Sequence, residues 1–361
     1  MPSPSQSQPR YVLGVMNKVA EKPDMPIPEM FIPPELELAT IQSHHETAPI
    51  PIFDLKTLLS APNTQLHHLY DACKEWGIFQ VGNHGVRGEV LENLKVEMEK
   101  FFNLPKEEKS KYQVQAGDFQ GYGNVIRCKE DEKVDWGERF FMVINPRERR
   151  KADLFEKLPE SLRDTLEAYF KELRKIGMGL LRILGEGVGM EIEEVDEIFE
   201  NGMHTTRMTY YPPCPNPEVV LGLTPHSDST GITILHQVNG IEGLQIKKQG
   251  LWLPVSFHPN AFLVLLGDIF EIVSNGVYNS MEHRVVVNKE EGRLSIAMFM
   301  NPKYEAEVGP SKSLISAENP PLFRRMIMED FVKDYFSRNL NGKSHLENMR
   351  IKTTSHDDED E

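Results

Sequence analysis

Residues 221–246 read LGLTPHSDSTGITILHQVNGIEGLQI, and they belong to a region of short β-branched and aromatic runs that extends over 207–302. Gly, Asn and Pro separate the runs, and these residues favour turns over strand interiors. Many short strands with turn signals between them are typical of a β-sandwich or a jelly roll. The clearest runs lie at 232–235, 243–246, 262–266, 285–287 and 295–299.

Helical periodicity precedes this region. Apolar residues between 66 and 76 predict a helix that ends at Gly77, and a short strand is expected at 78–81. A second helix is predicted from the apolar residues between 91 and 101. A longer helix is expected from Ser161 onward, where apolar residues recur every three or four positions. Helices and a β-rich core together indicate an α+β protein.

The patterns divide the chain into five segments. The first residues are rich in Pro, Ser and Gln, so an extended or disordered arm without regular structure is expected there. Apolar residues after Pro320 and Pro321 predict a closing helix, and the run of Asp and Glu at the end is interpreted as a solvated tail. The expected segments are the arm at 1–48, a helix-rich region at 49–205, the β-rich catalytic core at 206–310, the C-terminal helix at 311–352 and the acidic tail at 353–361.

Composition argues against several classes of protein. The 361-residue chain has a net charge of −15, whereas binding to DNA or RNA needs a basic face. No apolar run is long enough to cross a bilayer, and the first residues lack the layout of a secretory signal. Cys73, Cys128 and Cys214 are far apart and suit a reducing compartment as small buried thiols. We expect a cytoplasmic protein, a monomer by default, whose partner is a small molecule and not a nucleic acid or a membrane.

Three polar side chains in the β-rich region form a candidate metal site. His226 and Asp228 stand at i and i+2, and in an extended strand such side chains leave the same face. His283 stands just before another apparent strand and offers a third ligand. Two His and one carboxylate leave coordination positions open, as in non-haem iron(II) oxygenases, whereas a structural zinc site is closed by four ligands. The His-x-Asp triplet alone is a weak signal, because most histidines are core or surface residues.

A second i, i+2 pair favours the metal site over ordinary core or surface histidines. Arg293 and Ser295 follow His283 by about one strand length. Arg can bind a carboxylate through two hydrogen bonds while a hydroxyl takes a remaining lone pair. The pair therefore predicts an anchor for a dicarboxylate. Without the three metal-ligand candidates, the same Arg would be interpreted as part of a surface ion pair.

Ordered motifs along nearly the whole chain resemble the plant family of 2-oxoglutarate- and Fe(II)-dependent dioxygenases. The segments GLQI at 243–246 and LNGKS at 340–344 resemble the branch with the alkaloid O-demethylases and the senescence-related dioxygenase-like proteins. The other motifs are ACKEWGIFQ at 72–80, NHGV at 83–86, FFNLP at 101–105, DWGE at 135–138, YYPPCP at 210–215 and GD at 267–268.

The resemblance implies a fold and a set of bound molecules. A double-stranded β-helix, or jelly-roll, core with surrounding helices would use Fe(II), with 2-oxoglutarate and O2 as cosubstrates and ascorbate as reductant. His226, Asp228 and His283 would bind the iron. Arg293 and Ser295 would hold the distal carboxylate of 2-oxoglutarate.

The resemblance also bears on residues around these two sites. Tyr211 matches a family tyrosine that assists through its hydroxyl, and the alternative for this residue is a half-buried core position. Thr209 stands where the family usually has Asn, which would change the local hydrogen bonding. Candidate substrate-binding residues, each equally compatible with a core or rim position, are Phe299, Asn301, Phe141, Arg139 and Ser229.

The expected function is the oxidation of a mostly apolar plant specialised metabolite, such as an alkaloid or a phenolic. The outcome would be hydroxylation or O- or N-demethylation. The alternative is a non-catalytic ligand-binding or receptor protein on the same fold, because fold does not prove turnover. The presence of both the metal-ligand candidates and the Arg293 anchor favours the enzyme.

Overall fold

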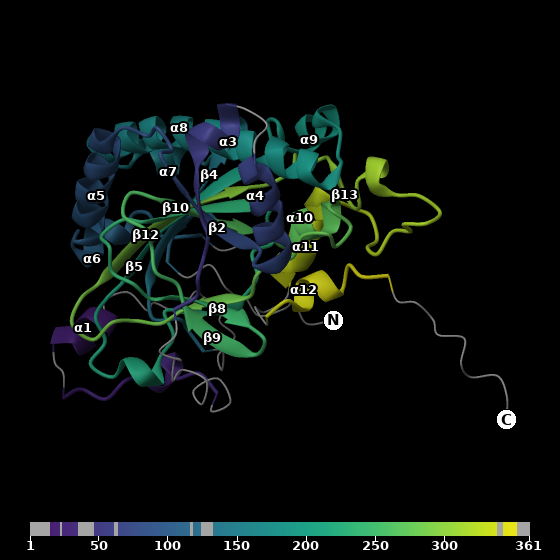
Figure 1. The fold of residues 1–361 in the computed structure, drawn as a ribbon. Helices are drawn as coiled ribbons and strands as arrows, with labels where there is room; N and C mark the ends of the chain where they lie inside the picture. Colours follow the sequence, from purple (N-terminus) through teal and green to yellow (C-terminus); the bar gives the residue numbers. More distant parts are fainter. Residues whose placement is uncertain are drawn as a thin grey trace, which may run out of the picture.

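The computed structural model describes residues 15–21, 24–34, 47–60, 64–115, 118–123, 133–337 and 342–351. In this part of the chain, helices cover one side of a large β-sheet, and a smaller β-sheet lies on the opposite side (Figure 1). The α+β arrangement agrees with the prediction. None of the described helices combines the length and the apolar character that crossing a bilayer requires. Cys128 and the acidic run at the end of the chain lie outside the described residues.

The large sheet has eight strands in the order β1-β2-β10-β7-β12-β5-β4-β3. Neighbouring strands are antiparallel except β1 and β2. Half of the sheet, β1 to β4, comes from the region 49–205, which was expected to be mainly helical. The bounds are β1 Ile52–Asp54, β2 Ile78–Gly82, β3 Gly121–Tyr122, β4 Glu138–Asn145, β5 His204–Tyr211, β7 Ile232–Gln237, β10 Phe262–Leu266 and β12 Arg293–Met300.

The smaller sheet has four antiparallel strands in the order β6-β11-β8-β9. The predicted strand at 285–287 is found two residues earlier, as β11. A further pair, β13 and β14, lies near the end of the chain. The bounds are β6 Leu223–His226, β8 Leu244–Lys248, β9 Leu251–Pro254, β11 His283–Val285, β13 Glu307–Val308 and β14 Met326–Ile327.

Alternation along β12 separates the two sides of the large sheet. Ile296 and Met298 belong to the apolar core that also contains the buried side of the long helix α8. Ser295, Ala297 and Phe299 point the other way and line a pocket together with residues of the smaller sheet. This alternation is the normal period of a strand. It places any functional side chain at an odd-numbered position of β12 inside the molecule, between the sheets.

The helices follow the predicted periodicity. The first predicted helix is α4, and it ends before Gly77, whose φ of 63° favours glycine. The close approach there also requires glycine, because an added Cβ would lie 2.1 Å from the carbonyl oxygen of Asn279. The helix expected from Ser161 is α8, and Gly189, which follows its last residue, lies in the left-handed region. The bounds are α3 Leu55–Ser60, α4 Thr64–Glu75, α5 Gly88–Phe102, α6 Lys106–Ser110, α7 Ala152–Glu156, α8 Glu160–Val188, α9 Ile192–Phe199 and α10 Asp268–Val273, with 3-10 turns at Arg147–Arg149, Pro217–Val219 and Lys312–Leu314.

The prediction of an N-terminal arm without regular structure is wrong for part of that segment. A helix, α1 Val15–Glu21, and a 3-10 turn, Glu29–Phe31, are present. Met16 and Phe31 are buried, and the Phe31 ring packs edge-on against Trp136 with 4.9 Å between centroids. Short helices are stabilised mainly by tertiary packing, so local composition held no sign of this one.

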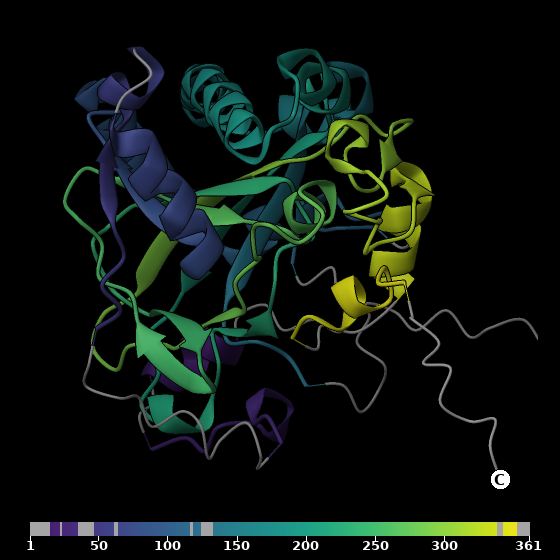
Figure 2. The same cartoon turned by 45° about the vertical axis from the view of Figure 1, so that its right-hand side comes forward.

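The single closing helix expected at 311–352 is also wrong. Leu322 is exposed outside any helix, and the helix expected after the two prolines begins later, as α11 Met328–Ser337. A second short helix, α12 Ser344–Glu347, follows. Figure 2 shows α11 and α12, in yellow, on the same side of the molecule as the green helix α10. The C-terminal segment thus reaches the same end of the molecule as β6 and β11.

Candidate active site

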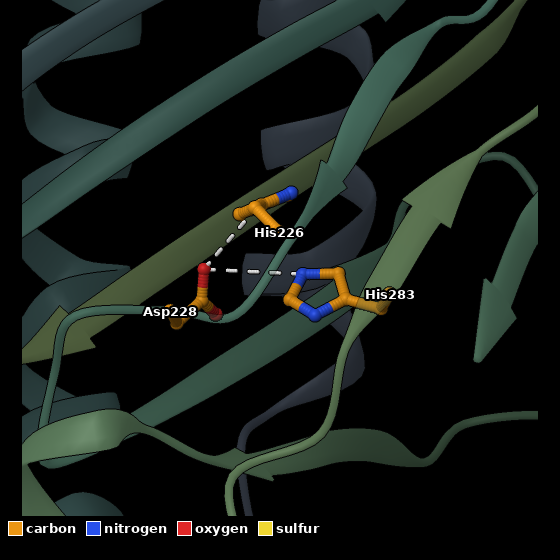
Figure 3. A group of neighbouring side chains, drawn as sticks. All are labelled: His226, Asp228 and His283. Atoms are coloured by element: carbon orange, nitrogen blue, oxygen red, sulfur yellow. Dashed lines mark ion pairs between the residues drawn. The ribbon is translucent and has the colours of Figure 1, made fainter. Parts of the chain in front are cut away.

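His226, Asp228 and His283 form a cluster (Figure 3), and Asp228 and His283 line the pocket between the two sheets. One potential ligand atom from each residue lies within 4.8 Å of the others. Asp228 Oδ1 is 3.5 Å from His226 Nε2 and 3.8 Å from His283 Nε2. His226 ends β6 and pairs across the sheet with His283, the first residue of β11. The expected cluster is therefore present.

The local geometry differs from the expectation in one respect. The strand β6 stops at His226, and Asp228 lies in the turn that follows. The i, i+2 pair therefore extends two residues past the end of the paired strand. The hydroxyl of Thr233 donates a 2.6 Å hydrogen bond to Asp228 Oδ2, which fixes the carboxylate.

Backbone carbonyls orient both imidazoles. Nδ1 of His226 lies 2.8 Å from the carbonyl oxygen of Thr224, and Nδ1 of His283 lies 3.0 Å from that of Met281. A proton on Nδ1 is required for these hydrogen bonds, so Nε2 keeps its lone pair. His226 Nε2 is buried and has no hydrogen-bond partner among the described residues. Two imidazole nitrogens and a carboxylate oxygen converge as a divalent cation requires.

Electrostatics supports the same protonation states. Burial lowers the pKa of His283 to about 4, and the neighbouring imidazole of His226 adds to this effect. His283 is therefore neutral near pH 7 and can act as a ligand. Burial raises the pKa of Asp228, but the two histidines and the Thr233 hydroxyl outweigh burial and hold that pKa below its ordinary value. The carboxylate is ionised.

Arg293 is a buried cation with free donors. Its side chain is almost fully buried, and burial lowers the pKa of its guanidinium. Nη1 donates to Ser295 Oγ over 3.2 Å, whereas Nε and Nη2 have no hydrogen-bond partner among the described residues. The guanidinium carbon lies 5.3 Å from the centre of the Tyr211 ring. A buried guanidinium with unpaired donors is costly unless an anion binds there.

The pocket contains one cation that the sequence analysis did not single out. Arg207 lies on β5 at the same face as Thr209 and Tyr211, and all three line the pocket. Its guanidinium carbon is 5.5 Å from the centre of the Phe299 ring. No ion pair joins it to a carboxylate within the described part of the chain. The i, i+2, i+4 spacing from Tyr211 was the signal that could have identified it.

The five candidate substrate residues have different positions. Phe299 lines the pocket, and the Phe141 ring stacks on it with 6.2 Å between centroids. Asn301 is buried just after β12 and does not line the pocket. Ser229 is partly exposed and interacts with the Tyr335 hydroxyl of α11. These positions leave Phe299 as the pocket wall and Phe141 as its support.

Arg139 forms a buried ion pair with Asp135 instead of lining the pocket. Its guanidinium donates to Asp135 over 2.6 Å and to the carbonyl oxygen of Gly222 over 3.2 Å. The other carboxylate oxygen of Asp135 accepts hydrogen bonds from the backbone and the hydroxyl of Thr224. The interpretation of Arg139 as a pocket residue is not supported, because its charge is neutralised in this buried ion pair outside the pocket lining.

Two packed sheets, three converging ligands and a buried guanidinium beside them define a jelly-roll metalloenzyme with open coordination positions. The model of the 2OG-Fe(II) oxygenase superfamily matches residues 202–302, and that of the non-haem dioxygenase in morphine synthesis N-terminal domain matches residues 50–161.

Known proteins are similar over most of their length. Oxoglutarate-dependent flavonoid 7-O-demethylase 1 of Ocimum basilicum is 47% identical over 84% of this chain and 82% of its own. Codeine O-demethylase of Papaver somniferum is 47% identical over 84% of this chain and 85% of its own. The crystal structure of JOX2 in complex with 2OG, Fe, and JA has a TM-score of 0.84 at 33% identity and covers 93% of this chain and 97% of its own. The chain belongs to the 2-oxoglutarate- and Fe(II)-dependent dioxygenases of plants.

Proposed function

We propose that this dioxygenase oxidises a ring-containing, mostly apolar plant metabolite and that an O-methyl group is its preferred point of attack. The observation that supports the dioxygenase activity is the unpaired, buried guanidinium of Arg293 beside Ser295, close to the three metal-ligand candidates. Such a guanidinium suits the distal carboxylate of 2-oxoglutarate, because Arg binds carboxylates through two parallel hydrogen bonds.

His226, Asp228 and His283 would hold the iron, and hydrogen bonds fix the orientation of all three side chains. When bound, Fe(II) with 2-oxoglutarate and O2 supplies the oxidising power that attacks a substrate C–H bond, while the oxo acid becomes succinate and CO2. The protein itself orients the ligands, holds the cosubstrate and excludes water from the pocket. Ascorbate would serve as the external reductant.

The pocket lining supports an apolar ring as substrate. Most lining residues apart from the two binding clusters are aliphatic or aromatic, and a flat ring can stack on Phe299. Arg207 is placed to bind one oxygen of the substrate, such as that of a phenolate, a carbonyl or a carboxylate. The aliphatic members of the lining are Leu223, Leu235, Leu244, Leu265, Val285 and Ala297.

The names of the relatives support demethylation in particular. Besides the flavonoid and codeine enzymes, thebaine 6-O-demethylase of Papaver somniferum is 45% identical over 87% of this chain. Hydroxylation of an O-methyl carbon gives a hemiacetal that loses formaldehyde. Hydroxylation of a ring or alkyl carbon leaves the oxygen in the product. The two outcomes differ in which C–H bond the pocket presents.

Product analysis tests the reaction type. We expect formaldehyde and succinate in equal amounts when the protein, Fe(II), ascorbate and 2-oxoglutarate are incubated with methoxylated flavonoids and alkaloids. The same panel without the methyl ether serves as the control and should give no formaldehyde. Succinate accompanied by a gain of one oxygen and no formaldehyde would establish hydroxylation and contradict demethylation. Turnover restricted to small, highly charged acids would contradict the apolar pocket.

Arg207→Leu tests the polar end of the pocket. We expect the KM for an accepted substrate to rise about 10-fold or more, because a hydrogen bond to a charged group contributes about 1.5–3 kcal/mol. The KM for the cosubstrate 2-oxoglutarate should stay the same. Arg87→Leu is the control, since Arg87 is exposed on the surface and is not one of the residues that line the pocket. An unchanged substrate KM in Arg207→Leu would show that this guanidinium does not bind the substrate.

A further inference from the structure

A buried carboxylate on α10 forms ion pairs with two cations of the C-terminal segment. Glu271 is 1% exposed. Its Oε2 accepts a 2.7 Å hydrogen bond from Lys343 Nζ, and its Oε1 accepts a 3.0 Å hydrogen bond from Arg350 Nη2. These two side chains come from just before and just after α12. The burial of the Glu271 charge depends on them, because an unpaired charge in this position is strongly unfavourable.

The same carboxylate is connected to both segments that carry the metal ligands. Ser280, three residues before His283, donates to Glu271 from its backbone N–H over 2.7 Å. The Ser280 hydroxyl lies 2.6 Å from Asp268, whose other carboxylate oxygen accepts from Ser227 over 3.0 Å. The backbone N–H of Asp268 donates to the carbonyl oxygen of Asp228 over 2.7 Å. One polar network thus joins the turn after β6 to the start of β11.

The backbone of the C-terminal segment touches the ligand turn directly. Gly342 forms an isolated parallel bridge with His226. The N–H of Gly342 donates to the carbonyl oxygen of Pro225, and the carbonyl oxygen of Gly342 accepts from the N–H of Ser227, each over 3.3 Å. These contacts are long, and the next residue along the chain, Lys343, is held more closely. Lys343 is anchored by Glu271 and by the carbonyl oxygen of Ser280, at 3.0 Å.

We propose that Lys343 and Arg350 are positioning residues for the metal site. Through Glu271 they set the spacing between the His226–Asp228 turn and His283, so the affinity for the metal depends on a segment that supplies no ligand. The proposal rests on the metal-ligand role of the three residues given under the proposed function. Residues in contact with metal ligands commonly change metal affinity by about 10–100-fold when they are replaced. Loss of one cation from Glu271 should have an effect at the lower end of this range, because it acts on the ligand segments through Ser280 and Asp268.

The test is Mn(II) binding to the full chain, measured by electron paramagnetic resonance of the free ion. Mn(II) is a stable probe with the same charge as Fe(II). We expect Lys343→Met to raise the dissociation constant about 10-fold, and Lys343→Arg to restore most of the affinity. The matched control is Lys333→Met on α11, because the ion pairs of Lys333 within the described residues are surface pairs with Glu329 and Asp330 and its side chain is 62% exposed. That variant should bind Mn(II) like the wild type.

The melting temperature of the metal-free proteins separates positioning from general stability. A lower Tm in Lys343→Met with wild-type Mn(II) affinity would overturn the proposal, because Lys343 would then be a purely structural residue. If Lys343→Met fails to fold, Arg350→Met tests the proposal in its place. We expect its dissociation constant for Mn(II) to rise a few-fold, and an unchanged constant would overturn the proposal. Failure of the wild type itself to bind Mn(II), or wild-type binding by His226→Ala, would overturn the metal assignment and this proposal together.

Discussion

His226→Ala, Asp228→Ala and His283→Ala should each abolish metal binding and lower turnover by more than about 100-fold. Each variant removes one of three ligands, and a bound metal ion contributes several kcal/mol to the stabilisation of a transition state. The fold should persist, because the apolar cores on the two sides of the large sheet do not depend on these side chains. Iron content after purification, turnover and melting temperature are the three measurements.

His68→Ala is the control for this series, because His68 is an exposed histidine on α4. It should retain iron and turnover. Wild-type rates in any of the three ligand variants, with iron at ordinary concentrations, would contradict the metal assignment. Loss of folding in all three would show that the buried polar cluster is needed for the structure itself. The iron content of the remaining folded fraction would then test the metal assignment.

Arg293→Lys should raise the KM for the cosubstrate 2-oxoglutarate by about 10–100-fold. Lys keeps the charge but cannot make the two parallel hydrogen bonds that a guanidinium makes, and a hydrogen bond to a charged group contributes about 1.5–3 kcal/mol. The KM for the primary substrate should change little when 2-oxoglutarate is saturating. Initial rates at varied concentrations of each compound separate the two effects.

Arg207→Leu provides the opposite pattern and therefore the comparison for Arg293→Lys. Both residues line one pocket, yet only Arg293 lies beside Ser295 with two unpaired donors. An unchanged cosubstrate KM together with a much poorer substrate KM in Arg293→Lys would place Arg293 in the substrate-binding part of the pocket. In that case an anionic group other than 2-oxoglutarate would have to bind the buried guanidinium of Arg293.

Features that depend on local periodicity were predicted from the sequence. The runs at 232–235 and 262–266 are strands, and the apolar stripe after Ser161 is α8. The pair Arg293 and Ser295 also shares a face as predicted, because β12 is continuous through both residues. In each case the period of the backbone decides which side chains point the same way. Such features need no knowledge of distant contacts.

Local patterns failed where tertiary contacts decide the conformation. The helix α1 forms because its apolar side chains are buried in a core made by distant residues. The sequence left Arg139 open between a pocket and a core position, and its partner Asp135 and its place outside the pocket lining become clear only in the folded chain. Arg207 shares a face with Tyr211 by its spacing, but only the folded chain shows that this face of β5 lines the pocket.

Which residues can bind a metal and a dicarboxylate follows from the sequence, because the chemistry of His, Asp, Arg and Ser and their i, i+2 spacing are local properties. How these residues meet follows from the folded chain. The register of β6 with β11 brings His226 beside His283, the turn after β6 directs Asp228 toward both, and the C-terminal segment lies against that turn. Register and docking depend on the balance of burial over residues far apart in the chain, and no local period contains that information.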